Sequence, residues 1–199
     1  MLYNYVTYLE YITAKINGFF LDQKEYICCH KGCSKCCEKG TYPYTEIEYK
    51  LIREGYNMLN DETQHIVNEN IKKTLEDKKN SNPNEKFIYV CPFLVNNSCT
   101  VYNYRGLICR IFGLMSFKPN TNETTKIPFC AYEGLNYSNI LDTVNNNLPP
   151  EKFEALGLKT EPKAFNIDYK NLIDEKFGES FGFEFGKVKS LIDWFEDIG

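Results

Sequence analysis

Cysteine is the residue type whose spacing in this chain predicts chemistry. Nine cysteines occur in 199 residues, and five of them lie in the segment Cys28-Cys29-His30-Lys31-Gly32-Cys33-Ser34-Lys35-Cys36-Cys37. Thiolates bind soft and borderline metals, and thiols two or three residues apart can curl around one ion or cluster. The segment therefore predicts a metal-binding loop. Its first ligand is either Cys28 or Cys29, and His30 is a further candidate.

Four more cysteines lie far along the chain, at Cys91, Cys99, Cys109 and Cys130. Any single one could be a small core residue, but the set as a whole favours metal binding. Without Cys28, eight thiols remain, which suits two four-thiolate sites, or one cluster with a few structural thiols. Because neighbouring side chains point in different directions, Cys36 and Cys37 could serve different metals.

The composition excludes several classes of partner. With 43% hydrophobic and 25% charged residues the chain is expected to fold, and its net charge of -4 offers no positive field to nucleic acid or to an anionic membrane. The longest apolar run, residues 87–95, contains Pro92 and is shorter than the ~20 residues of a spanning helix. The first residues lack the features of a secretory signal, so we expect a cytoplasmic protein with reduced thiols.

The elements that must position the cysteines are mostly helical. Apolar residues recur every three or four positions over residues 2–21, which predicts an amphipathic helix. The capping box Thr45-Glu46-Ile47-Glu48 predicts a helix over residues 45–56. A second helix is expected over residues 61–79, with Ile66, Ile71 and Leu75 as its apolar stripe.

Shorter elements follow. Residues 87–90 are aromatic and β-branched, which is typical of a strand. Short helices are expected over residues 105–112, 137–147, 150–156, 169–177 and 187–195, and residues 177–186 suit either a strand or a loop. We predict a mainly α fold with a few short strands, forming one compact, irregular domain over residues 1–199. A cysteine-ligated metal centre would organise its core motif region, 28–130, and residues 137–199 would form a helical C-terminal extension.

The cysteine spacing resembles that of a known family. Cys29-x3-Cys33-x2-Cys36-Cys37 is followed by Cys91-Pro-Phe-Leu and then by Cys99-x-Val-Tyr-x2-Arg105-x3-Cys109-Arg110-x-Phe112-Gly113. Over roughly residues 28–130 this combination resembles the YkgJ-like cysteine-cluster family, also called the CxxCxxCC or zinc- or iron-chelating domain. The chain departs from the usual pattern in having three residues between its first two motif cysteines, an extra Cys28, and Gly106 where proline is common.

The resemblance implies an iron–sulfur cluster, with a four-iron cluster favoured, or zinc. Eight thiols would hold it: Cys29, Cys33, Cys36, Cys37, Cys91, Cys99, Cys109 and Cys130. Arg105 and Arg110 flank Cys109, and cationic donors there would offset thiolate charge or bind the carboxylate of a cofactor. The resemblance extends to flagellin N-methylases, which implies S-adenosylmethionine as methyl donor and a lysine side chain of a protein as substrate.

Three classes of function stay open. The first is a cytoplasmic protein that binds an iron–sulfur cluster or zinc and has a redox or regulatory role. The second is an S-adenosylmethionine-dependent protein lysine N-methyltransferase, and the third is a zinc-stapled interaction module. The sequence has no glycine-rich nucleotide loop of the usual kind, which argues against the enzyme. Cys29-x3-Cys33-x2-Cys36 also equals the radical S-adenosylmethionine spacing, but Lys35 stands where those enzymes carry an aromatic residue, and repeating βα units are absent.

Overall fold

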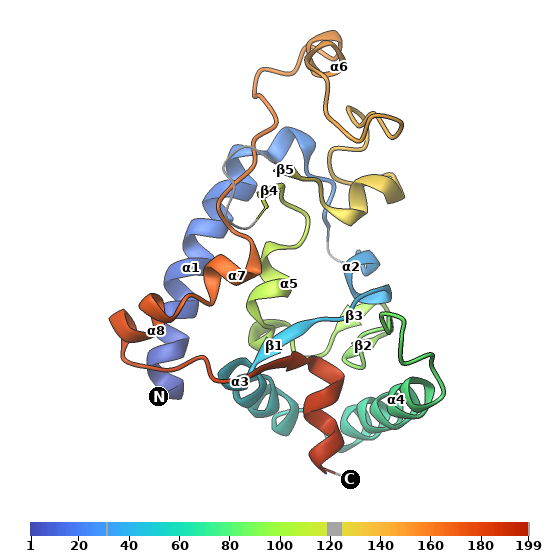
Figure 1. The fold of residues 1–199 in the computed structure, drawn as a ribbon, viewed down its shortest axis with the longest axis vertical. Coiled ribbons are helices and arrows are strands. Elements are labelled where there is room, and N and C mark those ends of the chain that lie inside the picture. The colour runs from blue at the N-terminus through green and yellow to red at the C-terminus, as the bar shows by residue number, and fades with distance from the viewer. Residues whose placement is uncertain (31, 119–124, 199) are drawn as a thin grey trace.

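A computed structural model describes residues 1–30, 32–118 and 125–198, and Figure 1 shows its fold. The α-helices are α1 (Leu2–Asp22), α2 (Lys35–Glu38), α3 (Glu46–Asn57), α4 (Asp61–Lys79), α5 (Leu107–Ile111), α6 (Pro150–Ala155), α7 (Tyr169–Leu172) and α8 (Glu175–Phe181). The 3-10 helices are η1 (Lys24–Tyr26), η2 (Tyr102–Tyr104), η3 (Phe129–Glu133) and η4 (Leu191–Ile198). The strands are β1 (Pro43–Thr45), β2 (Leu94–Val95), β3 (Ser98–Cys99), β4 (Ser116–Phe117), β5 (Thr125–Lys126) and β6 (Val188–Ser190). The predicted mainly helical class with a few short strands is confirmed.

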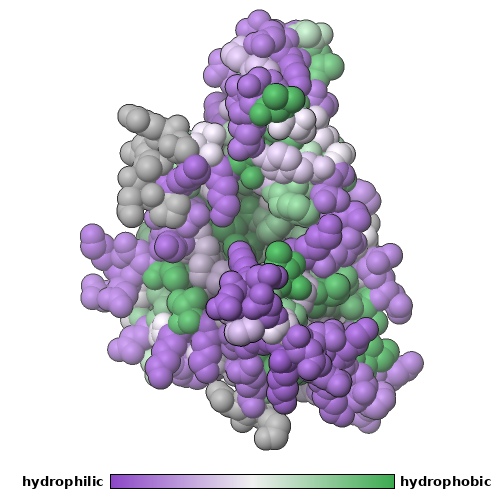
Figure 2. Space-filling model, turned by 45° about the vertical axis from the view of Figure 1, so that its right-hand side comes forward, coloured by the Kyte–Doolittle hydropathy of each residue, from purple (hydrophilic) through white to green (hydrophobic). Residues whose placement is uncertain are grey.

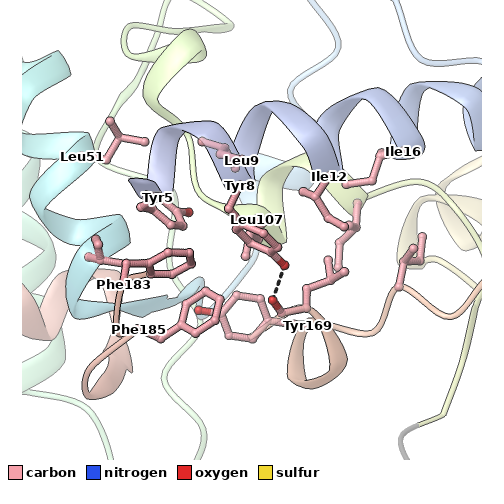
Figure 3. Packing of buried hydrophobic residues seen from close by; sticks show 14 of the residues in the cluster. Tyr5, Tyr8, Leu9, Ile12, Ile16, Leu51, Leu107, Tyr169, Phe183 and Phe185 are labelled. Atoms are coloured by element: carbon pink, nitrogen blue, oxygen red, sulfur yellow. Dashed lines mark hydrogen bonds between the residues drawn. The ribbon is translucent and has the colours of Figure 1, made fainter. Parts of the chain in front are cut away.

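The long helix α1 carries the largest apolar cluster. Its buried side chains are Tyr5, Tyr8, Leu9, Ile12 and Ile16, which lie on one face as the sequence period predicts. Figure 3 shows this face directed at Leu107 of α5 and at Phe183 and Phe185 near the C-terminus. The Tyr8 hydroxyl also donates a hydrogen bond to the Leu172 carbonyl. Residues from both ends of the chain therefore share one core with the helix that carries Cys109.

The two helices after β1 begin at side-chain caps. Thr45 Oγ1 accepts from Glu48 N at 3.4 Å, and Glu48 Oε2 accepts from Thr45 N at 2.8 Å, so the predicted capping box is present. Asn60 caps α4 in the same way, accepting from Thr63 N at 2.8 Å. The predicted apolar stripe of α4 is wrong at one position, because Val67 is buried and Ile66 is 37% exposed.

Each sheet consists of two antiparallel strands. One sheet joins the first part of the chain to its C-terminal part. In the β1 and β6 pair, Pro43 faces Ser190 and Thr45 faces Val188. Trp194 Nε1 donates to the Tyr44 carbonyl at 3.0 Å just beyond it. The helix predicted over residues 187–195 is therefore wrong in its first part, where strand pairing with β1 satisfies the backbone before η4 begins.

Four other local predictions are wrong in whole or in part. Residues 177–186, expected as a strand or a loop, begin as helix, because α8 extends to Phe181. Over residues 87–90 only Tyr89 pairs, in an isolated bridge to Gly40. The pairing does not extend into a continuous strand there. Residues 137–147 form turns, since the Asp142 carboxylate accepts from the Val144 and Asn145 amides at 2.9 Å and 3.2 Å and competes with helix formation. The helix expected over residues 169–177 is divided into α7 and α8, because Asp174 caps a new helix by accepting from Lys176 N at 2.9 Å.

No helix in the described ranges combines the length and hydrophobicity needed to cross a bilayer. Figure 2 shows a mostly hydrophilic face, with hydrophobic residues gathered in a hollow below the uppermost projection of the molecule. That projection carries α6 in Figure 1.

Candidate metal centre

The first cysteine segment forms a loop that ends in one helical turn. The Ser34 hydroxyl donates to Glu38 Oε1 at 2.7 Å, and the Cys37 amide donates to the Ser34 carbonyl at 2.7 Å. These bonds hold α2 although it has only four residues, and they leave the sulfur atoms of Cys36 and Cys37 3.9 Å apart. Along this segment exposure falls, from the exposed Cys28 and Cys29 to the half-buried Cys33, Cys36 and Cys37.

Backbone hydrogen bonds join the first cysteine segment to the second. The Cys91 amide donates to the Cys37 carbonyl at 2.8 Å, and Gly40 and Tyr89 exchange two bonds of 3.2 Å and 3.1 Å beside it. The chain entering Cys91 thus runs antiparallel to the chain leaving Cys37. These two cysteines, far apart in the sequence, become neighbours through main-chain contacts that need no metal.

Cys99 reaches the same place through a hairpin. The Leu94 amide donates to the Cys91 carbonyl at 3.0 Å, and the pairing of β2 with β3 sets Leu94 opposite Cys99. Cys91 is buried in the apolar cluster that contains Phe93 and Trp194. The partly buried residues packed against that cluster include Cys37, Cys99 and Cys109.

Cys109 lies on α5, whose start is fixed by two buried side chains of β1 and α3. Tyr44 Oη lies 3.6 Å from Cys109 Sγ and accepts from the Gly106 amide at 3.0 Å. Glu48 Oε1 accepts from the Leu107 amide at 2.7 Å. A β-carbon on Gly106 would lie 2.8 Å from Glu48 Oε1 and from the Tyr44 ring. Any residue larger than glycine at position 106 would therefore require Tyr44 or Glu48 to shift.

Cys29 and Cys130 meet through Asn136, whose side chain is fully buried. Asn136 Oδ1 accepts from the Cys28 amide at 2.7 Å, and Nδ2 donates to the Gly113 carbonyl at 2.8 Å and to Cys29 Sγ at 3.3 Å. One residue earlier, the Leu135 amide donates to the Cys130 carbonyl at 3.0 Å. The amide of Asn136 therefore fixes Cys29 rather than Cys28 against η3. His30 Nδ1 is directed at the Cys28 carbonyl, at 3.0 Å.

Burial makes these thiols weak acids. It raises the pKa of Cys109 and of Cys130 to about 12, and it raises the pKa of Cys91 well above the ordinary value. Burial also raises the pKa of Cys29, and the hydrogen bond from Asn136 opposes this by favouring the thiolate. The pKa of Cys36 is lowered instead, because Cys37 donates a hydrogen bond to its thiolate. A metal cation, which replaces the thiol protons, would offset the cost of the buried charge.

The two arginines differ in what they contact. Arg110 is engaged by protein oxygens, because its guanidinium donates to the Arg105 carbonyl at 3.1 Å, the Asn103 carbonyl at 2.9 Å and Thr13 Oγ1 at 3.2 Å. The Arg105 guanidinium stacks 3.7 Å from the centre of the Tyr102 ring. Its Nε is buried and has no hydrogen-bond partner within the described residues.

The donor set fits a thiophilic metal or cluster. All nine cysteines are free thiols, so none is consumed by a disulfide. Arg105 adds a buried N–H group that has no partner in the described ranges, of the kind that an anionic cluster would accept from. In the parts of the chain that the structure describes, no three thiol, imidazole or carboxylate groups already stand close enough to hold an ion. Metal binding would thus draw the thiols together.

Comparison with known families decides what kind of cysteine cluster this is. Residues 28–131, more than half of the chain, match the model of the CxxCxxCC family, which is described as "Putative zinc- or iron-chelating domain". The chain belongs to the CxxCxxCC family. No curated protein and no solved structure matches it. The predicted family is confirmed for this CxxCxxCC protein, whereas the ligand and arginine assignments and the methyltransferase and interaction-module hypotheses stay predictions.

The structure adds three residues that the sequence did not indicate as parts of the site. Asn136 carried only the signal of a glycosylation sequon, which says nothing about hydrogen bonding to a thiol. Glu48 was visible as a capping residue, but its second oxygen also fixes α5. Tyr44 lies beside that capping box and contacts Cys109. None of these contacts follows from local sequence, because each joins segments that are distant along the chain.

Proposed function

We propose that this CxxCxxCC protein binds an iron–sulfur cluster through its cysteine thiolates, and that the bound cluster serves a redox or regulatory role. The observation that carries the proposal is the convergence of Cys37, Cys91 and Cys109 in one apolar environment. The positive charge of Arg105 acts on Cys109, and the buried Nε of Arg105 has no hydrogen-bond partner among the described residues. Fully cysteine-ligated clusters are anionic, and N–H donors around their sulfur atoms tune their reduction potentials.

Arg105 favours a cluster over a single zinc ion. A cluster presents inorganic sulfides as well as thiolates, so it offers more sulfur acceptors to a nearby guanidinium than one tetrahedral ion does. The contact with the Tyr102 ring restrains the Arg105 guanidinium, and its buried Nε lacks a hydrogen-bond partner in the part of the chain that the structure describes. Burial raises the pKa of Cys99, and the positive charge of Arg105 acts against that rise.

Anaerobic purification with elemental analysis tests the proposal. We expect a coloured protein with iron and acid-labile sulfide in equal amounts, and less of both in the Cys33→Ser and Cys109→Ser variants. A colourless protein with stoichiometric zinc would show that the metal is assigned wrongly. A chain that takes up neither metal under reducing, metal-replete conditions would overturn chelation itself.

A further inference from the structure

Four of the cysteines belong to the apolar interior around the chain's second cysteine segment. Cys91 is buried in the apolar cluster, and Cys37, Cys99 and Cys109 pack against it. Main-chain contacts set three of them in place: the 2.8 Å bond between Cys91 and Cys37, and the hairpin that carries Cys99. Burial is the main cause that raises the pKa of Cys91, and the negative charges of Cys109 and Cys99 raise it further. These four thiols therefore share one apolar environment, and metal binding would draw their sulfur atoms together.

The remaining cysteines of the proposed ligand set lie on or before α2 and on η3, two elements that are in contact. Lys39, directly after α2, adds to this contact, since its ammonium lies 3.9 Å from the Glu133 carboxylate and 5.8 Å from the centre of the Phe129 ring. Asn136 ties Cys29 to the same region. Burial raises the pKa of Cys130, and the charges of Cys29 and Cys36 add to that rise. Burial is the largest cause that raises the pKa of Cys29, and the negative charges of Cys33, Cys36 and Cys28 raise it further.

Cys36 and Cys37 lie between the two groups. Consecutive side chains on a helix point about 100° apart, so one turn can present one sulfur to each group. Cys37 packs against the apolar cluster of Cys91, whereas Cys36 is not among the described residues packed against it. Beyond the effect of burial, the charge of Cys36 raises the pKa of thiols in both groups, Cys29 and Cys130 on one side and Cys91, Cys99 and Cys109 on the other. Their 3.9 Å contact is a hydrogen bond that requires a thiol proton, and it is lost when both sulfurs are thiolate ligands.

We propose that the chain builds two four-thiolate centres, an inner one from Cys37, Cys91, Cys99 and Cys109 and an outer one from Cys29, Cys33, Cys36 and Cys130. This inference rests on the proposed chelating function and adds the number of centres and the division of the ligands between them. The outer centre includes the exposed Cys29, whereas the inner one includes the buried Cys91. The outer centre is therefore the more accessible to a chelator.

Metal analysis of single-site variants tests this division. The wild type should contain about eight iron atoms, or about two zinc ions, per chain. Cys33→Ser (outer) and Cys99→Ser (inner) should each lose half of the metal, and the double variant should lose all of it. Cys28→Ser, a matched change at an exposed thiol beside the ligands, should keep the wild-type content.

A wild-type content of one centre, or complete loss in either single variant, would overturn the division while chelation stands. A wild type without metal would overturn the proposed function instead. Should a variant fail to fold, the wild type gives an independent measurement. Excess chelator should release its metal in two equal phases, with only the fast phase accelerated in a folded Asn136→Ala variant, and release in one phase would contradict two centres.

Discussion

The side-chain amide of Asn136 donates a hydrogen bond to the sulfur of Cys29 at 3.3 Å while its oxygen accepts from the Cys28 backbone at 2.7 Å. Asn136 is fully buried, whereas its two partners Cys28 and Cys29 are exposed, so these bonds connect the interior to the surface loop. The contact distinguishes Cys29 from the adjacent Cys28, because only the sulfur of Cys29 receives this hydrogen bond. Under the proposed ligand assignment, Asn136 positions Cys29 without binding metal itself.

Replacing Asn136 by Asp should therefore weaken metal binding. The change keeps an oxygen for the Cys28 amide, but it removes the donor to Cys29 and adds a negative charge beside a thiolate. Loss of a ligand's supporting hydrogen bond typically costs about 10–100-fold in metal affinity. Competition titration against a chromophoric chelator measures the change. Asn84→Asp, on an exposed turn, is the matched control, and equal affinities in the two variants would contradict the role of Asn136.

Arg105 should set the reduction potential of a bound cluster. Arg105→Gln removes the positive charge and the buried Nε donor, so we expect a more negative potential, because the reduced and more anionic cluster loses stabilisation. A spectroscopic redox titration of the purified protein measures the shift. Arg53→Gln, on α3, is the control for loss of one positive charge. An unchanged reduction potential in Arg105→Gln would show that this arginine does not act on the cluster.

Gly106→Pro should destabilise the protein. Proline has no N–H group for the Tyr44 hydroxyl, and its β-carbon would meet Glu48 Oε1 and the Tyr44 ring at 2.8 Å. Leaving a buried polar group unsatisfied costs roughly 1–3 kcal/mol, and overpacking adds a similar amount. Urea unfolding measures the loss. Gly18→Ala, at an exposed position of α1, is the control. The added β-carbon meets nothing within 4 Å, so this variant should be more stable than the wild type by about 0.5–1 kcal/mol.

Glu48 should make stability depend on pH. Burial raises the pKa of Glu48 in the folded state, although hydrogen bonds from Thr45, Tyr169 and Leu107 oppose the rise. A raised carboxyl pKa means that the folded state binds the proton more tightly. The contribution of Glu48 to the free energy of unfolding is therefore full at pH values below the unfolded-state pKa. It is lost as the pH rises through the folded-state pKa.

The Glu48→Gln variant removes that titration. The side-chain NH₂ group of the variant takes the place of a carboxyl oxygen that accepts from Leu107 N or Thr45 N. One of these backbone N–H groups therefore loses its acceptor, so the variant should be less stable than the wild type at low pH. This deficit should shrink as the pH rises above the unfolded-state carboxyl pKa of about 4.3 and through the raised pKa of the folded state, because only the wild type loses the proton. Urea unfolding at several pH values measures it. A deficit that grows with pH would contradict the raised pKa, and Glu69→Gln, at an exposed site, should show no such trend.

Local sequence determined the parts of this protein whose signals are local. The amphipathic period of α1, the capping box of α3 and the start of α4 each depend on residues within one or two turns, and all three match the structure. The CxxCxxCC family was likewise readable from cysteine spacing alone, and the match over residues 28–131 confirms it. A ligand type and its spacing are sequence properties, so metal-binding chemistry could be expected before any fold was known.

Tertiary structure alone decided how the cysteines are grouped. Cys91 meets Cys37 through a main-chain hydrogen bond, Cys29 meets η3 through Asn136, and β1 pairs with β6 from the other end of the chain. Such contacts form because buried amides and carbonyls must find partners wherever the packed core brings them together. The sequence fixes which partners are available, and the packing of α1, α5 and the C-terminal residues determines which of them come within hydrogen-bonding distance.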